Sequence, residues 1–332
     1  MTHIIAGGAG MIGSHLTDAL VAKGENVRVI DNLARGSWAN LLGSMATGRL
    51  KVKQLDLEST GFPIAPYDVV WHLAAKVTGI EYNRHNQYDM LRSNLAINYN
   101  VIESVRKQKP KLFVYVSTAC VYPHDAPVPT PEGAGDIGDP EPTNHGYGVA
   151  KWLGEQMVKH LCREHNIRCL IVRFFNALGE RDYYDHETSH VAPALIRRVL
   201  EGENPVVVWG TGQQTRALVD SKDIVKALLR LHDKMLTDET MYEGKYPEPP
   251  FVVNIGHERE VSIRELAETI VRLCDMPETP EIVYDTSKPD GYPRRAADTT
   301  FLRGLIGWVP DTPLEHTLVE MIKEFKEGRA HK

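Results

Sequence analysis

The sequence predicts an α/β protein with a doubly wound parallel sheet and a smaller, interleaved C-terminal lobe. Short β-branched runs alternate with longer amphipathic stretches through the first half of the chain, and the short runs are almost continuously apolar. Strands separated by helices form right-handed crossovers and hence a parallel sheet, whose strands are buried on both faces. After about residue 175 this alternation breaks down, which predicts the second lobe.

The individual elements follow from the same pattern. The expected strands are 3–6, 27–30, 69–73, 113–117 and 169–174, and the clearest helices between them are 12–23 and 91–107. We place the larger domain at 1–175, with later returns to it near 206–232 and 251–256. The smaller lobe takes most of 176–332, where stretches containing proline and glycine, such as 202–205 and 277–280, interrupt the pattern.

Composition excludes several classes of function. The chain has 332 residues, 42% of them hydrophobic, and a net charge of -6 without a basic stripe, which disfavours nucleic acid as a partner. No apolar run reaches the length of a membrane span. The four cysteines, Cys120, Cys162, Cys169 and Cys274, form no CxxC pair and have no metal-ligand spacing. The sequence does not start with a signal-like segment, so we expect a reduced, cytoplasmic protein. We also expect that it binds no metal and that it acts on small molecules.

A glycine-rich turn follows the first predicted strand and opens the first predicted helix. Gly7, Gly10 and Gly13 stand in a GxxGxxG pattern that also contains Met11 and Ile12. Glycines let the backbone approach a pyrophosphate, and a helix N-terminus supplies free N–H groups and a positive dipole end. Strand, turn and helix together predict a dinucleotide site in a Rossmann-type domain, with a merely tight connection as the competing interpretation.

Asp31 indicates which dinucleotide is bound. It ends the second predicted strand, 18 residues after Gly13, where a carboxylate can accept hydrogen bonds from a ribose and would repel a 2′-phosphate. NAD is therefore the predicted cofactor, and NADP is less favoured. Two alternatives stay open: Asp31 could cap a turn with Asn32, and Arg35 could still pair with a phosphate.

A tyrosine four residues before a lysine gives the chain its predicted acid/base group. Tyr147 and Lys151 lie on one face of a predicted helix, and a lysine ammonium beside a phenol is expected to lower the tyrosine pKa from about 10. Thr118 follows a strand at the sheet edge where such folds bind ligands, and its hydroxyl could bond a substrate hydroxyl. The competing interpretation is that Tyr147 and Lys151 are four residues apart by chance, on a helix face exposed to solvent.

These three motifs together resemble the extended short-chain dehydrogenase/reductase family, the NAD-dependent epimerase/dehydratases, from end to end. Within it the chain is most similar to the GDP-L-fucose synthases and next to the GDP-mannose 3,5-epimerases. The matching segments span both lobes: HLAAKVTGI at 72–80, CVYP at 120–123, EPTN at 141–144, SHVAPALIRR at 189–198, VWGTG at 208–212 and SKPDGYPRR at 287–295.

The resemblance implies catalytic roles for five residues. Thr118, Tyr147 and Lys151 match the family's Ser/Thr, Tyr and Lys, although serine is more usual at the first position. Cys120 and His190 match a pair that handles protons on carbons beside a ketone. Both residue types titrate near the useful range. Taken alone, Cys120 would be a small buried hydrophobe and His190 an ordinary surface residue.

The resemblance also implies two sets of binding residues. The cofactor is expected to contact Gly7, Gly10, Met11, Ile12, Gly13, Asp31, Asn32, Asp56, Leu57, Leu73, Ala74, Ala75, Tyr147 and Lys151. A nucleotide-diphosphate sugar is expected to contact Lys76, Asn176, Arg198, Trp209, Arg216 and Arg294, with Arg295 as the alternative to its neighbour, because guanidinium groups bind phosphate bidentately. The family is also expected to form a homodimer through helices of the larger domain.

Three reactions fit these predictions. The first is an NAD-dependent epimerase of a nucleotide sugar of the GDP-mannose type, which oxidises C4 transiently and inverts C3 and/or C5. The second is an NADPH-dependent epimerase/reductase of the GDP-L-fucose synthase type. The third is a C4 epimerase or other NAD-dependent nucleotide-sugar enzyme, which needs neither Cys120 nor His190. A non-catalytic dinucleotide-binding protein is the alternative from another class.

Overall fold

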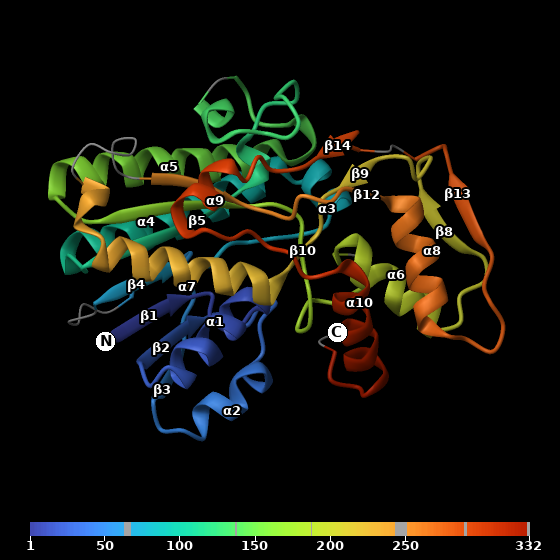
Figure 1. Ribbon diagram of the computed structural model, residues 1–332, viewed down its shortest axis with the longest axis horizontal. Helices are drawn as coiled ribbons and strands as arrows, with labels where there is room; N and C mark the ends of the chain where they lie inside the picture. The colour runs from blue at the N-terminus through green and yellow to red at the C-terminus, as the bar shows by residue number, and fades with distance from the viewer. Residues whose placement is uncertain (63–67, 137, 187, 243–250, 289–290, 331–332) are drawn as a thin grey trace.

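The computed structural model describes residues 1–62, 68–136, 138–186, 188–242, 251–288 and 291–330, so positions 289 and 290 of the SKPDGYPRR segment lie outside the described residues. The chain forms a larger α/β domain and a smaller lobe, which lie side by side (Figure 1).

The core of the larger domain is a seven-stranded parallel sheet of strand order β11-β6-β5-β4-β1-β2-β3, which confirms the predicted fold class. Successive strands run outward in both directions from the boundary between β1 and β4, the switch point where such sheets bind ligands. The strands are β1 (Thr2–Ala6), β2 (Asn26–Asp31), β3 (Leu50–Gln54), β4 (Val69–His72), β5 (Leu112–Thr118), β6 (Cys169–Phe174) and β11 (Phe251–Ile255).

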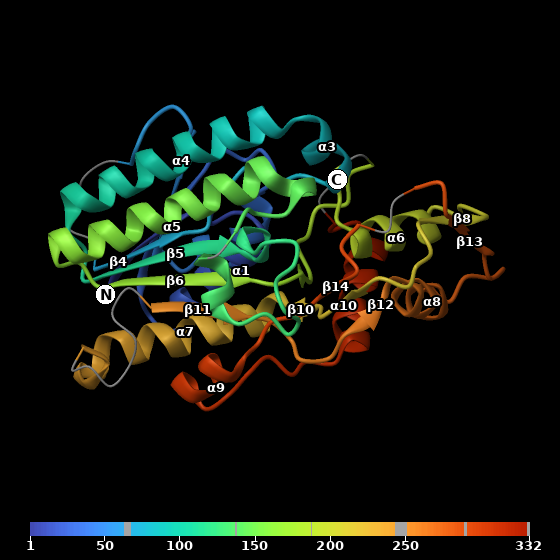
Figure 2. The same ribbon diagram turned by 90° about the horizontal axis from the view of Figure 1, so that it is seen from above.

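Helices cover both faces of the sheet, so its strands are apolar throughout. Ile5 and Val29 face one layer of helices, whereas their neighbours Ile4 and Ile30 face the other, as the two-residue period of a strand requires. Figure 2 shows α4 and α5 on one side of the sheet and α7 and α9 on the other. The helices of these layers are α1 (Met11–Ala22), α7 (Ser221–Thr237), α9 (Thr300–Ile306), α4 (Gln87–Gln108) and α5 (His145–His165).

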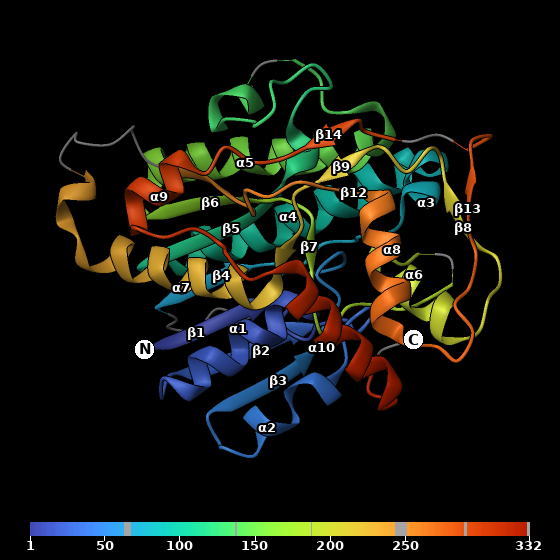
Figure 3. The same cartoon turned by 45° about the vertical axis from the view of Figure 1, so that its right-hand side comes forward.

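The smaller lobe has its own apolar core between three helices and a two-stranded parallel sheet (Figure 3). These elements are α6 (Val191–Leu200), α8 (Ile263–Cys274), α10 (Leu314–Lys326), β8 (Val206–Trp209) and β13 (Ile282–Asp285). Short strands lie between the two parts of the molecule: β12 (Val261–Ser262), β9 (Thr215–Arg216) and β14 (Arg294–Arg295) form one sheet, and β7 (Ala177–Leu178) pairs with β10 (Val219–Asp220). Two short helices, α2 (Leu42–Met45) and α3 (Ile80–His85), complete the fold.

The later parts of the chain are distributed between the two lobes. Segment 251–256 supplies the edge strand β11 beside β6, as its apolar composition suggests. Segment 206–232 divides, because β8 pairs with β13 in the smaller lobe, whereas α7 packs against α1 and the sheet. The edge strand β3 was not expected from the sequence. Its exposed Lys51 and polar neighbours give it no continuous apolar run, and lysines are common on edge strands.

Among the described residues, no helix combines the length and the apolar character needed to cross a membrane. Within the same ranges, no group of three or more His, Cys, Asp or Glu side chains is placed to hold a metal ion.

Two buried histidines should make the stability of the fold depend on pH. His3 and His72 are fully buried. Burial and the nearby His232 lower the pKa of His3 to about 4, and burial with the nearby Lys151 lowers the pKa of His72 to about 3. Both rings stay neutral in the folded state, whereas the unfolded chain binds protons below pH 6.5. Stability is therefore present above that pH and is lost as the pH falls. At about pH 5, each histidine should make the free energy of unfolding about 2 kcal/mol lower than at neutral pH.

Urea unfolding at neutral and acidic pH measures this effect. Gln in place of His3 should remove that residue's share, about 2 kcal/mol, of the loss between about pH 6.5 and pH 5. The exposed Gln213 is the control, since Gln213→Asn removes no titrating group and should leave the pH dependence unchanged. An equal loss for wild type and His3→Gln would contradict the prediction.

Candidate active site

A cavity of about 1700 Å³ opens at the carboxyl edge of the sheet and extends into the smaller lobe. The turns after β1, β2, β4, β5 and β6 all contribute to its wall, because parallel strands end at the same edge. Every residue predicted to bind cofactor or substrate lines this cavity except Arg294. The five residues predicted to be catalytic also line it.

The glycine turn forms a cradle that larger side chains would fill. Gly7 has φ +81°, and a Cβ there would lie 2.7 Å from the backbone nitrogen of Ala74. A Cβ at Gly13 would collide with the carbonyl oxygen of Gly7. Helix α1 begins directly after Gly10, so the first turn of the helix, with its free N–H groups, forms part of the cavity wall. These residues fit the pyrophosphate of a dinucleotide.

Asp31 is built into the same cradle. Its Oδ2 accepts a hydrogen bond from the backbone N–H of Ala9 at 2.9 Å, and its Oδ1 accepts one from Leu33 at 2.9 Å. Burial raises the pKa of this carboxyl, and the two backbone hydrogen bonds oppose the rise. Arg35 also lines the cavity, and its Nη1 donates to the carbonyl oxygen of Val77 at 2.7 Å. Asp31 thus caps the turn that follows β2, through its bond to Leu33, and it also lines the cavity.

The threonine, tyrosine and lysine of the predicted acid/base group come together at the ends of β5 and α5. Tyr147 lies close enough to Thr118 for the threonine to influence its pKa, and the Oγ1 of Thr118 accepts a hydrogen bond from the N–H of Cys120 at 3.2 Å. Lys151 is buried one turn further along α5, and its Nζ donates to the carbonyl oxygen of Val116 at 3.0 Å. Thr118, Tyr147 and Lys151 therefore all line the cavity at this edge of the sheet.

The expected direction of the tyrosine pKa was wrong. Burial and the neighbouring Cys120 raise the pKa of Tyr147, and the nearby Thr118 only partly opposes this rise. Burial also lowers the pKa of Lys151 to about 7, against the opposing effect of Glu155. Lysine spacing alone predicted a lowered tyrosine pKa, but desolvation disfavours the charged form of both groups.

A buried ion pair holds the helix that carries Lys151 against the sheet. Arg173 on β6 donates to Glu155 on α5 through Nε at 2.9 Å and Nη2 at 2.6 Å, and both side chains are fully buried. Ser117 donates to the same carboxylate at 2.5 Å. The remaining guanidinium nitrogen, Nη1, donates to the hydroxyl of Tyr122 and to the carbonyl oxygen of Glu132. The network fixes α5, and hence Lys151, against β5 and β6.

Cys120 and His190 line the cavity from different parts of the molecule. Cys120 is half-buried in the turn after β5, close enough to Tyr147 to affect its pKa. His190 caps the N-terminus of α6 and is 43% exposed, with Nδ1 3.6 Å from the buried Asp182. Both residues line the cavity, and within the described part of the chain no hydrogen bond joins them.

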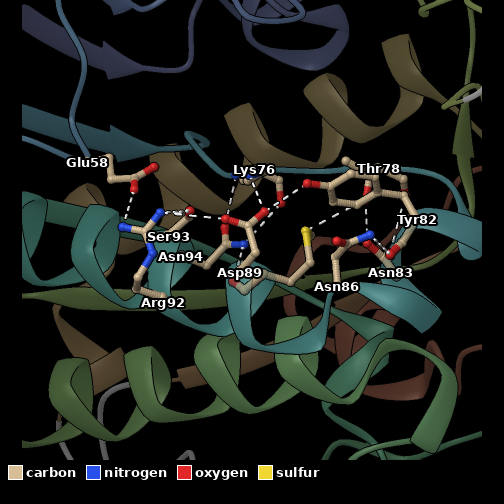
Figure 4. Close-up of polar contacts among 11 residues, drawn as sticks. Glu58, Lys76, Thr78, Tyr82, Asn83, Asn86, Asp89, Arg92, Ser93 and Asn94 are labelled. Carbon is tan, nitrogen blue, oxygen red and sulfur yellow. Dashed lines mark hydrogen bonds and ion pairs between the residues drawn. The ribbon is translucent and has the colours of Figure 1, made fainter.

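The loop after β4 is held in place by a polar cluster on α3 and α4 (Figure 4). Lys76 forms an ion pair with Asp89, which also accepts a hydrogen bond from Tyr82 at 2.9 Å. Burial acts to lower the pKa of Lys76, but the ion pair outweighs it and raises the pKa. Asn94 accepts a hydrogen bond from the Lys76 N–H at 3.0 Å and donates one to its carbonyl oxygen at 3.1 Å. The predicted substrate residue Lys76 is thus already paired at the cavity rim.

The predicted arginines differ in their surroundings. Arg198 lines the cavity but is bonded to Glu203 and, at 2.6 Å, to the carbonyl oxygen of Val207. Arg216 is partly buried and lies against the cavity, and burial with the nearby Arg295 lowers its pKa to about 10. Trp209 lines the cavity wall and is 43% exposed.

Of the two neighbouring arginines, Arg295 lines the cavity and Arg294 does not. The Arg294 guanidinium is exposed and pairs with Glu260 at 2.6 Å, outside the cavity, whereas Arg295 faces the cavity. Adjacent residues on a strand point to opposite faces, and sequence alone does not say which face of β14 meets the site. Asn176 lines the cavity, but its side chain donates to the carbonyl oxygens of Ala217 at 3.1 Å and of Arg295 at 3.2 Å.

Sequence reasoning also missed Glu141 and Asp182 as cavity residues. Glu141 lies in the EPTN segment and is 2% exposed, and Asp182 is 4% exposed beside His190. A buried carboxylate facing a cavity suggests function. The only sequence signal was the EPTN segment itself, because burial at these positions depends on contacts with distant parts of the chain.

The glycine cradle, the tyrosine and lysine, and the second lobe define an NAD(P)-dependent enzyme of the short-chain dehydrogenase/reductase type. Residues 3–256 match the model of the NAD dependent epimerase/dehydratase family. The chain belongs to this family.

Named relatives agree with this assignment over nearly the whole chain. It is 33% identical to the probable GDP-L-fucose synthase 1 of Oryza sativa subsp. japonica, over 98% of this chain and 92% of that one. It is 32% identical to the GDP-L-fucose synthase of Escherichia coli strain K12, over 98% and 96%. Among solved structures, the UDP-glucose 4-epimerase of Thermotoga maritima, with UDP-glucose, matches at a TM-score of 0.80, with 26% identity over 99% of both chains. These relatives carry the names of nucleotide-sugar enzymes.

Proposed function

We propose that the chain is an NAD-dependent epimerase of a nucleotide sugar of the GDP-mannose type. It oxidises C4 transiently and exchanges protons at C3 and/or C5. The observation that carries the NAD preference is Asp31, whose carboxylate is hydrogen-bonded to Ala9 of the glycine turn. A 2′-phosphate at this position would meet the buried Asp31 carboxylate, and one terminal nitrogen of the nearby Arg35 is already bonded to Val77. The GDP-linked sugar is supported by the names of two relatives.

The residues of the cavity have distinct roles in this proposal. The nicotinamide cofactor would accept a hydride from C4 and return it. Tyr147 removes the proton of the C4 hydroxyl, and Thr118 holds that hydroxyl and the phenol together. The charge of Lys151 favours the phenolate when the lysine is protonated. Cys120 removes a proton from the carbon beside the ketone, and His190, which lines the same cavity, returns one to the opposite face of the ring.

A second candidate is the NADPH-dependent epimerase/reductase of the GDP-L-fucose synthase type. It uses the same Cys120 and His190, and overall similarity to its named members favours it. Asp31 opposes it, because a dissociable NADPH would have to place its phosphate beside that carboxylate. The expected homodimer and the cytoplasmic location stay predictions.

Cofactor content and solvent-deuterium exchange test the proposal together. We expect the purified protein to hold NAD⁺ and to convert GDP-mannose without added reductant, with deuterium from D₂O appearing at C3 or C5 by NMR. A panel of GDP-, UDP-, CDP- and dTDP-sugars identifies the accepted base. Strict consumption of NADPH would reject the epimerase in favour of the reductase.

Ser in place of Cys120 separates inversion beside C4 from C4 chemistry alone. We expect Cys120→Ser to reduce deuterium incorporation by roughly 100-fold or more, because serine is a much weaker base than a cysteine thiolate. Cys274→Ser is the control, since Cys274 is buried in the smaller lobe, outside the cavity. Undiminished turnover of Cys120→Ser would point to a C4 epimerase.

A further inference from the structure

Arg295 reaches the Cys120 thiol from the far end of the sequence. Its Nη1 lies 3.7 Å from the Cys120 Sγ. The guanidinium also lies over the ring of Tyr292, 4.7 Å from its centroid, so it is held on that side as well. Arg295 comes from β14 and Cys120 from the turn after β5, and both line the cavity.

A buried carboxylate fixes the other side of the guanidinium. Arg295 Nη2 forms an ion pair with Glu141, which is 2% exposed. The second oxygen of Glu141 accepts a hydrogen bond from Asn144, and Asn144 accepts one from Asn83 at 2.7 Å. The chain of contacts continues to Thr78, on the loop shown in Figure 4. The arginine is thereby held in one orientation, and the ion pair compensates its burial.

We propose that Arg295 is a positioning residue for Cys120: its guanidinium stabilises the thiolate and fixes the Sγ, and Glu141 holds the guanidinium in place. The inference deepens the proposed function, in which Cys120 acts as a base on a carbon-bound proton. It also explains why the segments CVYP, EPTN and SKPDGYPRR occur together in one chain, since one residue of each meets at this contact.

The charges around Cys120 show why such a partner is needed. Burial raises the pKa of the thiol, and the Glu141 carboxylate raises it further. Tyr147 and Tyr292 also face the thiol, and each would oppose a thiolate if ionised. Thr118 contributes a hydrogen bond, and the positive charge of Arg295 opposes the effects of burial and of the carboxylate. Removing it would leave burial and the carboxylate without an opposing charge.

Both terminal nitrogens of Arg295 have partners within the protein. One of its terminal nitrogens is bonded to the thiol and the other to Glu141. Arg216, which lies close enough to Arg295 for the two charges to interact, keeps the role proposed for it at the substrate side.

The pH profile of thiol alkylation tests this inference without any sugar or cofactor. The full-length protein is treated with iodoacetamide at a series of pH values, and peptide mass spectrometry follows Cys120. The half-buried Cys162, remote from Arg295, serves as the internal reference. We expect Arg295→Met to move the Cys120 midpoint upward by about one pH unit and to slow its alkylation at neutral pH roughly tenfold. Arg295→Lys should restore most of the wild-type profile.

Arg294→Met is the matched control. It removes an arginine from the adjacent position of β14, where the side chain is exposed and pairs with Glu260, so the Cys120 profile should not change. Arg295→Gln keeps a donor without the charge and carries the same expectation as Arg295→Met. It replaces that variant if alkylation of the buried Cys169 and Cys274 shows that the methionine variant has unfolded.

Two outcomes would overturn the inference. One is a Cys120 profile in the folded Arg295→Met or Arg295→Gln variant that superimposes on the wild-type profile. The other is an equal shift in Arg294→Met. Because the assay reads the thiol directly, a failure here leaves the proposed reaction standing, and a failure of the proposed reaction leaves the thiol measurement valid.

Discussion

Phenylalanine in place of Tyr147 should reduce turnover by roughly 100- to 10,000-fold, the usual contribution of a positioned general acid or base. The substitution removes only the hydroxyl of a residue that lies near Thr118 and lines the cavity. The ring and its packing on α5 remain, so the fold should not change and the protein should still retain cofactor through its other contacts. Initial rates with the accepted nucleotide sugar, together with the retained cofactor, measure both parts of this expectation.

Tyr99→Phe provides the matched control. Tyr99 lies on α4 and is 57% exposed, away from the cavity, so its hydroxyl should not affect the rate. A Tyr147→Phe enzyme with normal turnover would remove Tyr147 from the reaction and revive the interpretation that the fold binds a dinucleotide without catalysis.

Methionine in place of Arg173 should have the largest effect on stability, a loss of about 3 to 5 kcal/mol of unfolding free energy. The substitution leaves the Glu155 carboxylate buried without its bidentate partner, and both side chains are fully buried in the native protein. The double variant Glu155→Met, Arg173→Met should recover much of the loss, because it removes the charge that the single variant leaves unpaired. Urea unfolding of the three proteins gives the comparison.

A surface pair supplies the reference for this effect. Arg303 and Glu258 are paired at 2.7 Å but are each more than half exposed, so Arg303→Met should cost less than about 1 kcal/mol. If Arg173→Met proved no less stable than Arg303→Met, the buried network would not be what holds α5 against the sheet.

Patterns local in sequence predicted the sheet and the glycine cradle well. Apolar runs located β1, β2, β4, β5 and β6, because strands buried on both faces need no alternation. The GxxGxxG turn and Asp31 line the same cavity, because both lie at the ends of parallel strands. Parallel topology alone places such ends at one edge.

Contacts distant in sequence could not be predicted in the same way. Arg295 meets Glu141 and Cys120 only because β14 pairs with β9 between the two lobes, a register that no local pattern specifies. The raised pKa of Tyr147 depends on burial by other segments, whereas the YxxxK spacing shows only the neighbouring lysine. Polar edge strands such as β3 likewise lack the apolar run that marks their buried neighbours.

The placement of β11 has a consequence for how the molecule can be divided. This strand pairs with β6 and follows a long excursion of the chain into the smaller lobe, and α7 and α9 return to cover one face of the sheet. A fragment ending near residue 175 would leave the edge of β6 and an apolar face open to water, the surfaces from which aggregation starts. We therefore expect the two lobes to unfold as one cooperative unit, and a chain cut between them should not yield two separately folded parts.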